Sequence, residues 1–160
     1  MRFYWPVMTD VAEITPRVTV CNCQAVRQAA RHVTQLYDRH MAPVGLRITQ
    51  YSLMMTLSRL GPLSINALAD HMVMDRTTMG RALRPLQRDG LIAIGRGKDG
   101  RTRALSLTPA GKLKLDAAMP LWRAAQAEFE AAFGTDESAD FRATLAKAAV
   151  LFRQVESPVP

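Results

Sequence analysis

Hydrophobic residues recur along most of the chain at the three- and four-residue spacing of α-helices. Seven apolar residues from Val26 to Met41 form one face of a helix expected over 21–41, and Pro43 and Gly45 end it. The same spacing predicts further helices over 50–60, 65–72, 75–89, 109–133 and 137–155. The chain is therefore expected to be mainly α-helical.

Several of these helices have recognisable first and interior residues. The residues expected to cap their amino ends are Thr49, Ser64, Asp75 and Thr108. Oxygens of such side chains accept hydrogen bonds from the free amides of a first helical turn. Pro85 and Pro120 lie inside expected helices, where a missing amide hydrogen predicts a bend.

Two short apolar runs, 91–94 and 104–107, flank a turn expected over 95–100 that holds three glycines. Such runs around a glycine-rich turn predict a β-hairpin. The helices expected over 65–72 and 75–89 precede it directly. Helix, turn, helix and hairpin in this order predict a winged helix-turn-helix unit, which we expect over 46–108.

Positive charge is concentrated in this unit. The chain has 21 basic and 14 acidic residues, and eight basic against three acidic residues lie between 75 and 103. Met79, Leu83 and Leu86 share one face of the helix expected over 75–89, while Thr77 and the arginines recur on another. The alternative is a solvated helix whose arginines only keep the protein in solution.

A polyanion explains both the charge and the arrangement. The second helix of such a unit enters the major groove, with its first turn nearest the base edges and later arginines nearer the backbone. Basic residues of the hairpin reach phosphates or the minor groove. The residues expected to contact DNA on these grounds are Arg76, Thr77, Thr78, Arg81, Arg84, Arg88, Arg96, Lys98, Arg101 and Arg103.

Other features narrow the classes of function. The sequence pI is about 10.1, but no apolar run approaches the roughly 20 residues of a membrane-spanning helix. The first ten residues lack the apolar core of an export signal, so the cytoplasm is the expected location. No glycine-rich phosphate loop, no Ser, His and acid set and no paired carboxylates in an apolar stretch occur. We therefore expect neither an enzyme nor a bound cofactor or metal.

The helices at the two ends are more apolar than one small winged unit can cover. We expect residues 1–20 to be a partly disordered lead-in, and 21–45 with 109–160 to pack against a second copy. A twofold dimer presents two basic helices on one side, which predicts a palindromic operator with half-sites roughly 34 Å apart. The alternative is an intramolecular bundle in a monomer.

Two stretches, DRTTMGRALRPLQRDGLI (75–92) and DGRTRALSLTPAGK (99–112), resemble the MarR family of bacterial transcriptional regulators. The resemblance covers about 21–156 and implies an all-α dimer with a small wing. It also implies DNA binding by 75–88 and by Asp99 and Arg101, the aspartate orienting the arginine two residues later. Gly80 departs from the larger residue expected there.

Cys21 and Cys23 stand at the start of the first helix. Cysteines this close form only a strained disulfide with each other, so another partner or none is expected. A thiol at a helix amino end is reactive. By resemblance to the family's organic-hydroperoxide sensors, Cys23 occupies the reactive position and Tyr37 matches one tyrosine partner, whereas Arg27 and Ile48 replace the others.

Two other interpretations of these thiols stay open. Buried or helix-start cysteines commonly behave as small hydrophobes. Metal binding with His32 and His40 is the third option, although Cys-x-Cys lacks a second pair at a recognised zinc spacing.

The resemblance also suggests a small-molecule pocket between the terminal helices and the winged unit. Its expected lining is Met41, Tyr51, Met54, Met55 and Met72. Methionine adapts to ligands, but equally well to an ordinary core. We thus expect a repressor that binds its operator as a homodimer and is released by a ligand or by cysteine oxidation. A winged-helix module that binds a protein and not DNA is the alternative.

Overall fold

The structure is a computed structural model that describes residues 20–96 and 103–156, with the backbone alone for 153–156. The chain divides into two compact units, residues 1–34 and 35–160. Helix α1 (Asn22–Met41) begins in the first unit and ends in the second. The remaining elements are η2 (Ala42–Val44), α2 (Ile48–Leu60), α3 (Ile65–His71), α4 (Arg76–Arg88), β1 (Ile92–Arg96), β2 (Arg103–Leu107), α5 (Pro109–Phe133) and α6 (Thr135–Glu156).

The described chain is mainly helical, with one small antiparallel sheet, which confirms the predicted fold class. Strands β1 and β2 pair from Ile92 opposite Leu107 to Arg96 opposite Arg103. Leu63, just before α3, forms an isolated bridge with Leu105, which ties the hairpin to the helices. Among the described helices, none is both long and apolar enough to cross a lipid bilayer.

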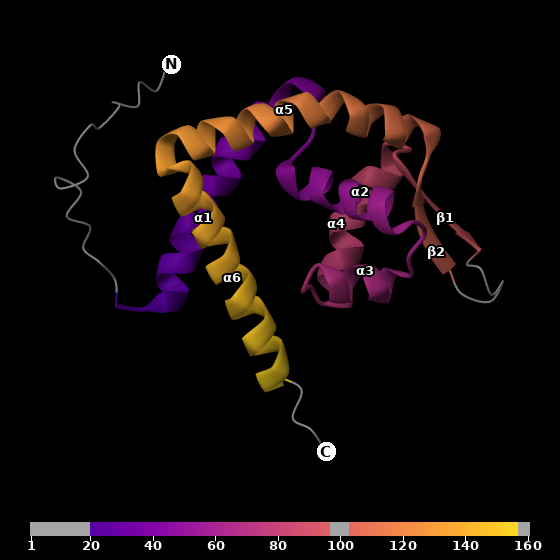
Figure 1. The fold of residues 1–160 in the computed structure, drawn as a ribbon. Helices are drawn as coiled ribbons and strands as arrows, with labels where there is room; N and C mark the ends of the chain where they lie inside the picture. The colour runs from indigo at the N-terminus through magenta and orange to yellow at the C-terminus, as the bar shows by residue number, and fades with distance from the viewer. Residues whose placement is uncertain (1–19, 97–102, 157–160) are drawn as a thin grey trace. The chain divides into compact units, whose positions relative to one another are not determined.

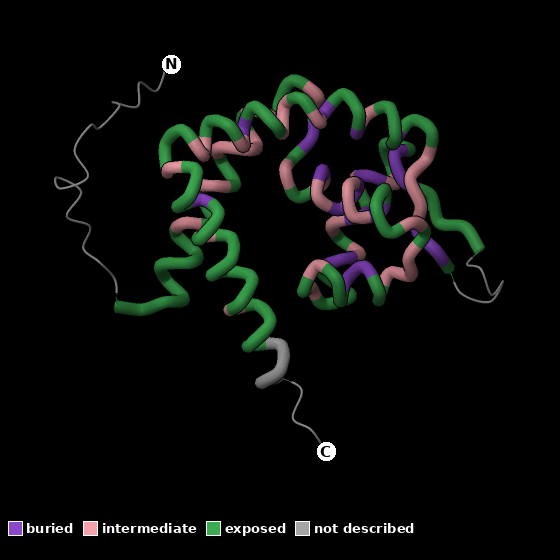
Figure 2. The backbone as a smooth tube through the Cα atoms, in the orientation of Figure 1, coloured by how far each residue is buried: buried purple, intermediate pink, exposed green. Residues whose placement is uncertain are grey.

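The core of the second unit lies where α2, α3, α4, the hairpin and the first half of α5 meet (Figure 1). Its most deeply buried side chains include Leu53, Met54, Leu68, Met79, Leu83, Leu86 and Leu105. Figure 2 shows buried residues gathered in these elements, whereas α6 is exposed along most of its length. The winged unit is therefore a packed body, and α5 forms part of its wall.

Three of the four predicted caps are confirmed: the side chains of Ser64, Asp75 and Thr108 each accept a hydrogen bond from a first-turn amide. The prediction for α2 was wrong. This helix begins at Ile48, one residue before Thr49, because the Ile48 amide donates to the Asp38 carboxylate at 2.7 Å. The acceptor thus comes from another helix, ten residues earlier in the chain.

Other boundaries differ less. Strand β1 continues to Arg96, so Gly95 pairs with Ala104 and does not belong to the turn, contrary to the prediction. Pro85 and Pro120 both lie inside continuous helices. Leu113 is 72% exposed, because the side of α5 that enters the core is carried by Leu115 and Ala118.

Candidate nucleic-acid interface

The amino end of α4 is fixed by its own first turn. Asp75 Oδ1 accepts a hydrogen bond from the Thr78 amide at 2.8 Å, and the Thr78 hydroxyl donates to Oδ2. These bonds, the side-chain bond first, lower the pKa of the Asp75 carboxyl. The Thr78 hydrogen is therefore committed within the helix, and the hydroxyl faces a ligand as an acceptor only.

Helix α4 has two faces of opposite character, as predicted. Met79, Leu83 and Leu86 are at most 1% exposed and pack into the core. The exposed residues on the rest of its surface are Arg76, Thr77, Thr78, Arg81, Arg84 and Arg88. Burial of the apolar face fixes the direction in which the arginines point.

The arginines of α4 differ in how far they are neutralised. Among the described side chains, Arg76, Arg81 and Arg84 have no carboxylate partner. Arg88 Nε lies 2.9 Å from Asp89 Oδ1, and this hydrogen bond raises the pKa of Arg88 and lowers that of Asp89. Three guanidinium groups on this helix are thus available to an external anion, and the fourth is partly occupied.

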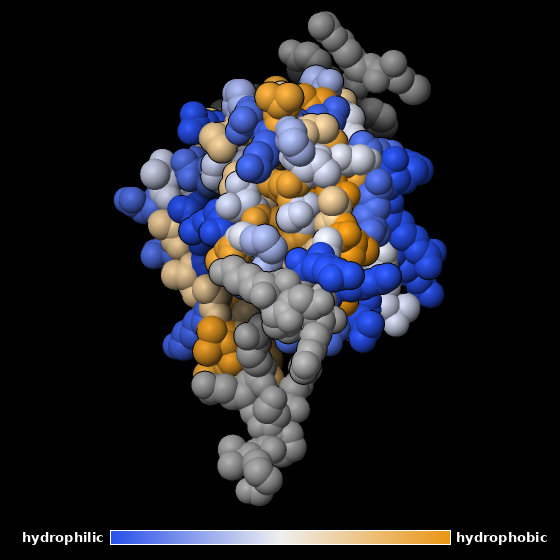
Figure 3. All heavy atoms as spheres, turned by 90° about the vertical axis from the view of Figure 1, so that its right-hand side faces the viewer, coloured by the Kyte–Doolittle hydropathy of each residue, from blue (hydrophilic) through white to orange (hydrophobic). Residues whose placement is uncertain are grey.

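The hairpin adds two cations in one place. Arg96 and Arg103 are exposed and directly opposite each other at the far end of the ladder. Like charges in this position repel each other, and a bound anion relieves the repulsion. Figure 3 looks onto the side that carries the hairpin, where hydrophilic residues gather along both edges. The predicted contacts Lys98, Asp99 and Arg101 lie outside the described residues.

A polar junction holds α4, the hairpin and α5 together. The Thr108 hydroxyl donates to the Gly90 carbonyl at 2.7 Å and accepts from the Gly111 amide at 3.0 Å. The Thr108 amide donates to the Leu91 carbonyl at 3.1 Å. A Cβ at Gly111 would lie only 2.0 Å from that same carbonyl oxygen. The sequence predicted Thr108 as a cap, but not its link to the end of α4.

The expected pocket residues lie in or beside the core. Met41, Tyr51 and Met54 are buried, and Met55 and Met72 are partly buried. The Tyr51 ring stacks on Trp122 of α5, with 6.2 Å between ring centroids. The buried Tyr51 hydroxyl has no hydrogen-bond partner among the described residues.

Burial raises the pKa of Tyr51, and the charge of Arg123 opposes that effect. Trp122 was predicted only as part of the apolar surface of α5. An open cavity of about 630 Å³ lies elsewhere, beside Val73, Asp75 and Phe152, and none of the five expected pocket residues lines it. The predicted ligand pocket stays a prediction.

Comparisons with known proteins identify the class of regulator. The model of the MarR family matches residues 46–99. The chain is 38% identical to the Mycobacterium tuberculosis transcriptional regulator MosR, of which it covers 98%, with 83% of this chain aligned and a TM-score of 0.70. That MosR structure is a complex with DNA. The chain belongs to the MarR family.

Other MarR-like proteins agree with this assignment. A probable transcriptional regulator from Pseudomonas aeruginosa is 28% identical over 79% of this chain and 96% of its own, with a TM-score of 0.72. The Bacillus subtilis regulator YwoH is 23% identical over 91 residues, 57% of this chain and 66% of YwoH, just under two thirds of its length. MarR-family regulators are DNA-binding transcription factors and not enzymes.

The cysteines of this MarR-family chain are accessible. Cys21 and Cys23 are both exposed in the first unit, and no disulfide joins them. Exposure contradicts the interpretation of these two residues as buried hydrophobes. Among the described residues, no three His, Cys, Asp or Glu side chains come together as metal ligands.

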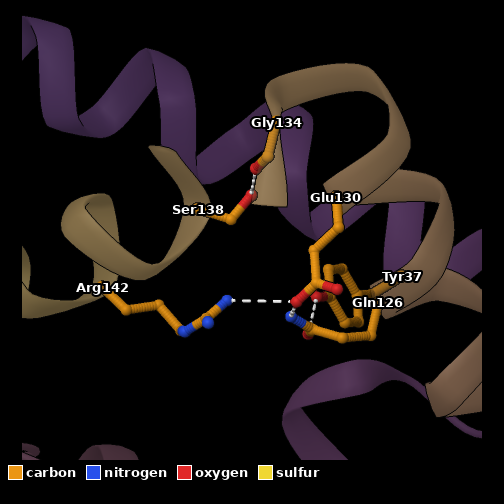
Figure 4. A network of polar contacts seen from close by, with 6 residues as sticks. All are labelled: Tyr37, Gln126, Glu130, Gly134, Ser138 and Arg142. Atoms are coloured by element: carbon orange, nitrogen blue, oxygen red, sulfur yellow. Dashed lines mark hydrogen bonds and ion pairs between the residues drawn. The ribbon is translucent and has the colours of Figure 1, made fainter. Parts of the chain in front are cut away.

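Tyr37, the predicted redox partner, belongs to the second unit and takes part in a polar network (Figure 4). Its hydroxyl donates to Gln126 Oε1 at 2.5 Å, and Gln126 Nε2 donates to Glu130 Oε1 at 2.9 Å. Arg142 of α6 lies 3.5 Å from the same Glu130 oxygen. Burial first, then the charge of Glu130, raises the pKa of Tyr37, and Arg142 opposes both. The network joins α1, α5 and α6.

Proposed function

We propose that this MarR-family transcriptional regulator inserts α4 into the major groove of an operator and reaches adjacent phosphates with its hairpin. The strongest support is the set of unneutralised guanidinium groups of Arg76, Arg81 and Arg84 opposite a fully buried face. MosR, crystallised with DNA, adds support at 38% identity. The proposed contacts are Arg76, Thr77, Thr78, Arg81, Arg84, Arg88, Arg96, Lys98, Asp99, Arg101 and Arg103.

We further propose that residues 21–45 and 109–160 form a homodimer that presents two winged units, 46–108, to a palindromic site. Ser138 is the sole buried residue among the described side chains of α6. Val150, Leu151 and Phe152 are 58%, 50% and 67% exposed on the same helix. Apolar surface of this kind is characteristic of an interface, and a twofold partner buries it.

The proposed regulation is repression, released by a small molecule or by oxidation of Cys21 or Cys23. The unpartnered Tyr51 hydroxyl supports the first route, because a buried phenol without a hydrogen bond costs about 1–3 kcal/mol that a polar ligand recovers. The stacked Trp122 favours a flat, phenolic ligand. Exposure of both thiols supports the second route.

A salt titration tests the DNA interface. Wild-type protein first selects duplexes from a random pool, and its affinity for them is then measured against salt concentration. Arg84→Ala should flatten the logarithmic slope by about one unit, since each phosphate contact releases about one counterion. Arg88→Ala should flatten it less, because Asp89 already holds that guanidinium. Arg76→Ala or Thr77→Ala should relax the sequence preference.

The matched control is Arg123→Ala, which removes the same charge from exposed surface of α5. An unchanged slope in Arg84→Ala, equal to that of the control, would show that α4 is not the DNA-binding helix. If the wild type retains no duplex at all, the winged unit binds a protein instead.

Separate measurements test release. After one equivalent of an organic hydroperoxide, mass spectrometry should find Cys23 oxidised and DNA binding lost, and Cys23→Ser should keep binding. A panel of hydroxybenzoic acids should weaken DNA binding by the wild type and less so by Tyr51→Phe. An unmodified Cys23 with intact binding removes the oxidation route, and equal responses of Tyr51→Phe and wild type remove Tyr51 from the ligand site.

A further inference from the structure

One row of residues along α4 contains a gap. Side chains four apart in sequence lie next to one another on a helix and form a ridge. On α4 one such ridge is Arg76, Gly80, Arg84 and Arg88. Three arginines thus stand in line, and the second place in the row has no side chain.

Nothing in the described part of the chain requires glycine at this place. A Cβ built on Gly80 has no atom within 4 Å, so packing does not exclude a side chain. Gly80 has a negative φ, so the backbone conformation does not demand glycine either. By contrast, a Cβ at Gly111 collides with a carbonyl oxygen. The reason for Gly80 therefore lies outside the described protein.

Glycine at this position also has a cost. Apart from proline, it is the least favourable residue in a helix interior, because it gains the most freedom on unfolding. Gly80 is partly exposed and lies beside Thr77 and Arg84, on the flank of the cationic face. A binding partner that comes closer to the helix axis than any side chain permits would account for it.

We propose that Gly80 is the point of closest approach between α4 and the operator, where duplex DNA packs directly on the helix backbone. This inference rests on the proposed function, since it takes α4 to be the helix in the major groove. Arg76 and Arg84 then reach past the duplex on either side of the gap. Contact at Gly80 is steric and short-ranged, so it favours the base steps whose edges fit the gap.

The proposal predicts opposite changes in stability and in binding. Gly80→Ala should raise Tm by about 2 °C, because alanine favours the helix. The same variant should bind duplexes selected by the wild type about tenfold more weakly. Gly80→Leu, with another good helix former, should weaken binding further. The salt slope should stay at its wild-type value in both variants, because no phosphate contact is lost.

Two controls separate this idea from others. Ser58→Ala raises helix propensity on exposed surface of α2 and should raise Tm without a change in affinity. If glycine served only to keep α4 flexible, Gly80→Ala would bind as tightly as wild type or tighter, and alanine and leucine would behave alike. Either result overturns the proposal.

Arg84→Ala, measured on the same duplexes, distinguishes the two levels of inference. If Arg84→Ala flattens the salt slope while Gly80→Ala binds normally, α4 still contacts DNA and only the close approach at Gly80 is wrong. If neither variant changes binding, both proposals fail.

Discussion

Thr108→Val tests the junction that holds the recognition helix to α5. Valine keeps the size and branching of threonine but has no hydroxyl. In the native protein that hydroxyl accepts from the Gly111 amide at 3.0 Å and donates to the Gly90 carbonyl at 2.7 Å. Loss of the helix cap costs about 1 kcal/mol. The second bond adds only about 0.5 kcal/mol, because Gly90 is exposed and water replaces the hydroxyl.

The expected decrease in the free energy of unfolding is thus about 1.5 kcal/mol, or about 5 °C in Tm for a chain of this size. Urea and thermal unfolding of Thr108→Val and Thr108→Ser measure it. Serine keeps the hydroxyl and loses only a methyl group, so it should stay close to wild type. Equal stability of the two variants would mean that the two hydrogen bonds do not hold this junction, and the reasoning would be refuted.

Three further predictions concern stability. Gly111→Ala should lower the free energy of unfolding by about 3 kcal/mol in urea, because its Cβ lies 2.0 Å from the Leu91 carbonyl oxygen; a wild-type value would contradict this close approach. Val73→Asn should raise it by about 1 kcal/mol, since Val73 has φ 53 and asparagine tolerates that conformation; an unchanged midpoint would exclude strain. The hydrogen bond from Thr78 lowers the pKa of Asp75, so its contribution is present at neutral pH and is lost as pH falls through that lowered value. Asp75→Asn should therefore lose less stability than wild type below about pH 4, and parallel curves would contradict the assignment.

Local chemistry explains what the sequence predicted correctly. Asp75 and Thr108 each bond to an amide three residues later, so the signal for the helix start lies within one turn. The start of α2 was misjudged because its acceptor, Asp38, comes from α1. No pattern within the helix itself reveals a partner ten residues away.

The candidate site shows the same division. Helical spacing alone placed Arg81 and Arg84 on the side opposite Met79, and the structure agrees. The juxtaposition of Arg96 and Arg103 depends on strand register, which the glycine-rich turn did not specify. Gly80 was visible in the sequence as a departure, but only coordinates show the open space beside it.

The contacts of α5 explain how a signal at one place could reach α4. Thr108 bonds its first turn to the end of α4, Trp122 stacks on Tyr51 near its middle, and Gln126 accepts from Tyr37 beyond that. A 25-residue helix is about 37 Å long. A tilt of about 5° about one end moves the other by about 3 Å, as much as the length of a hydrogen bond.

Release of DNA therefore requires no unfolding of the winged unit, only a small change in the direction of α5. A ligand at Tyr51 drives that change only as far as it binds the tilted form more tightly than the DNA-bound form. Because binding linkage is reciprocal, operator DNA must weaken the ligand by the same factor by which the ligand weakens the operator. A ligand whose affinity is the same with and without DNA would bind the protein without regulating it, however tightly it held Tyr51.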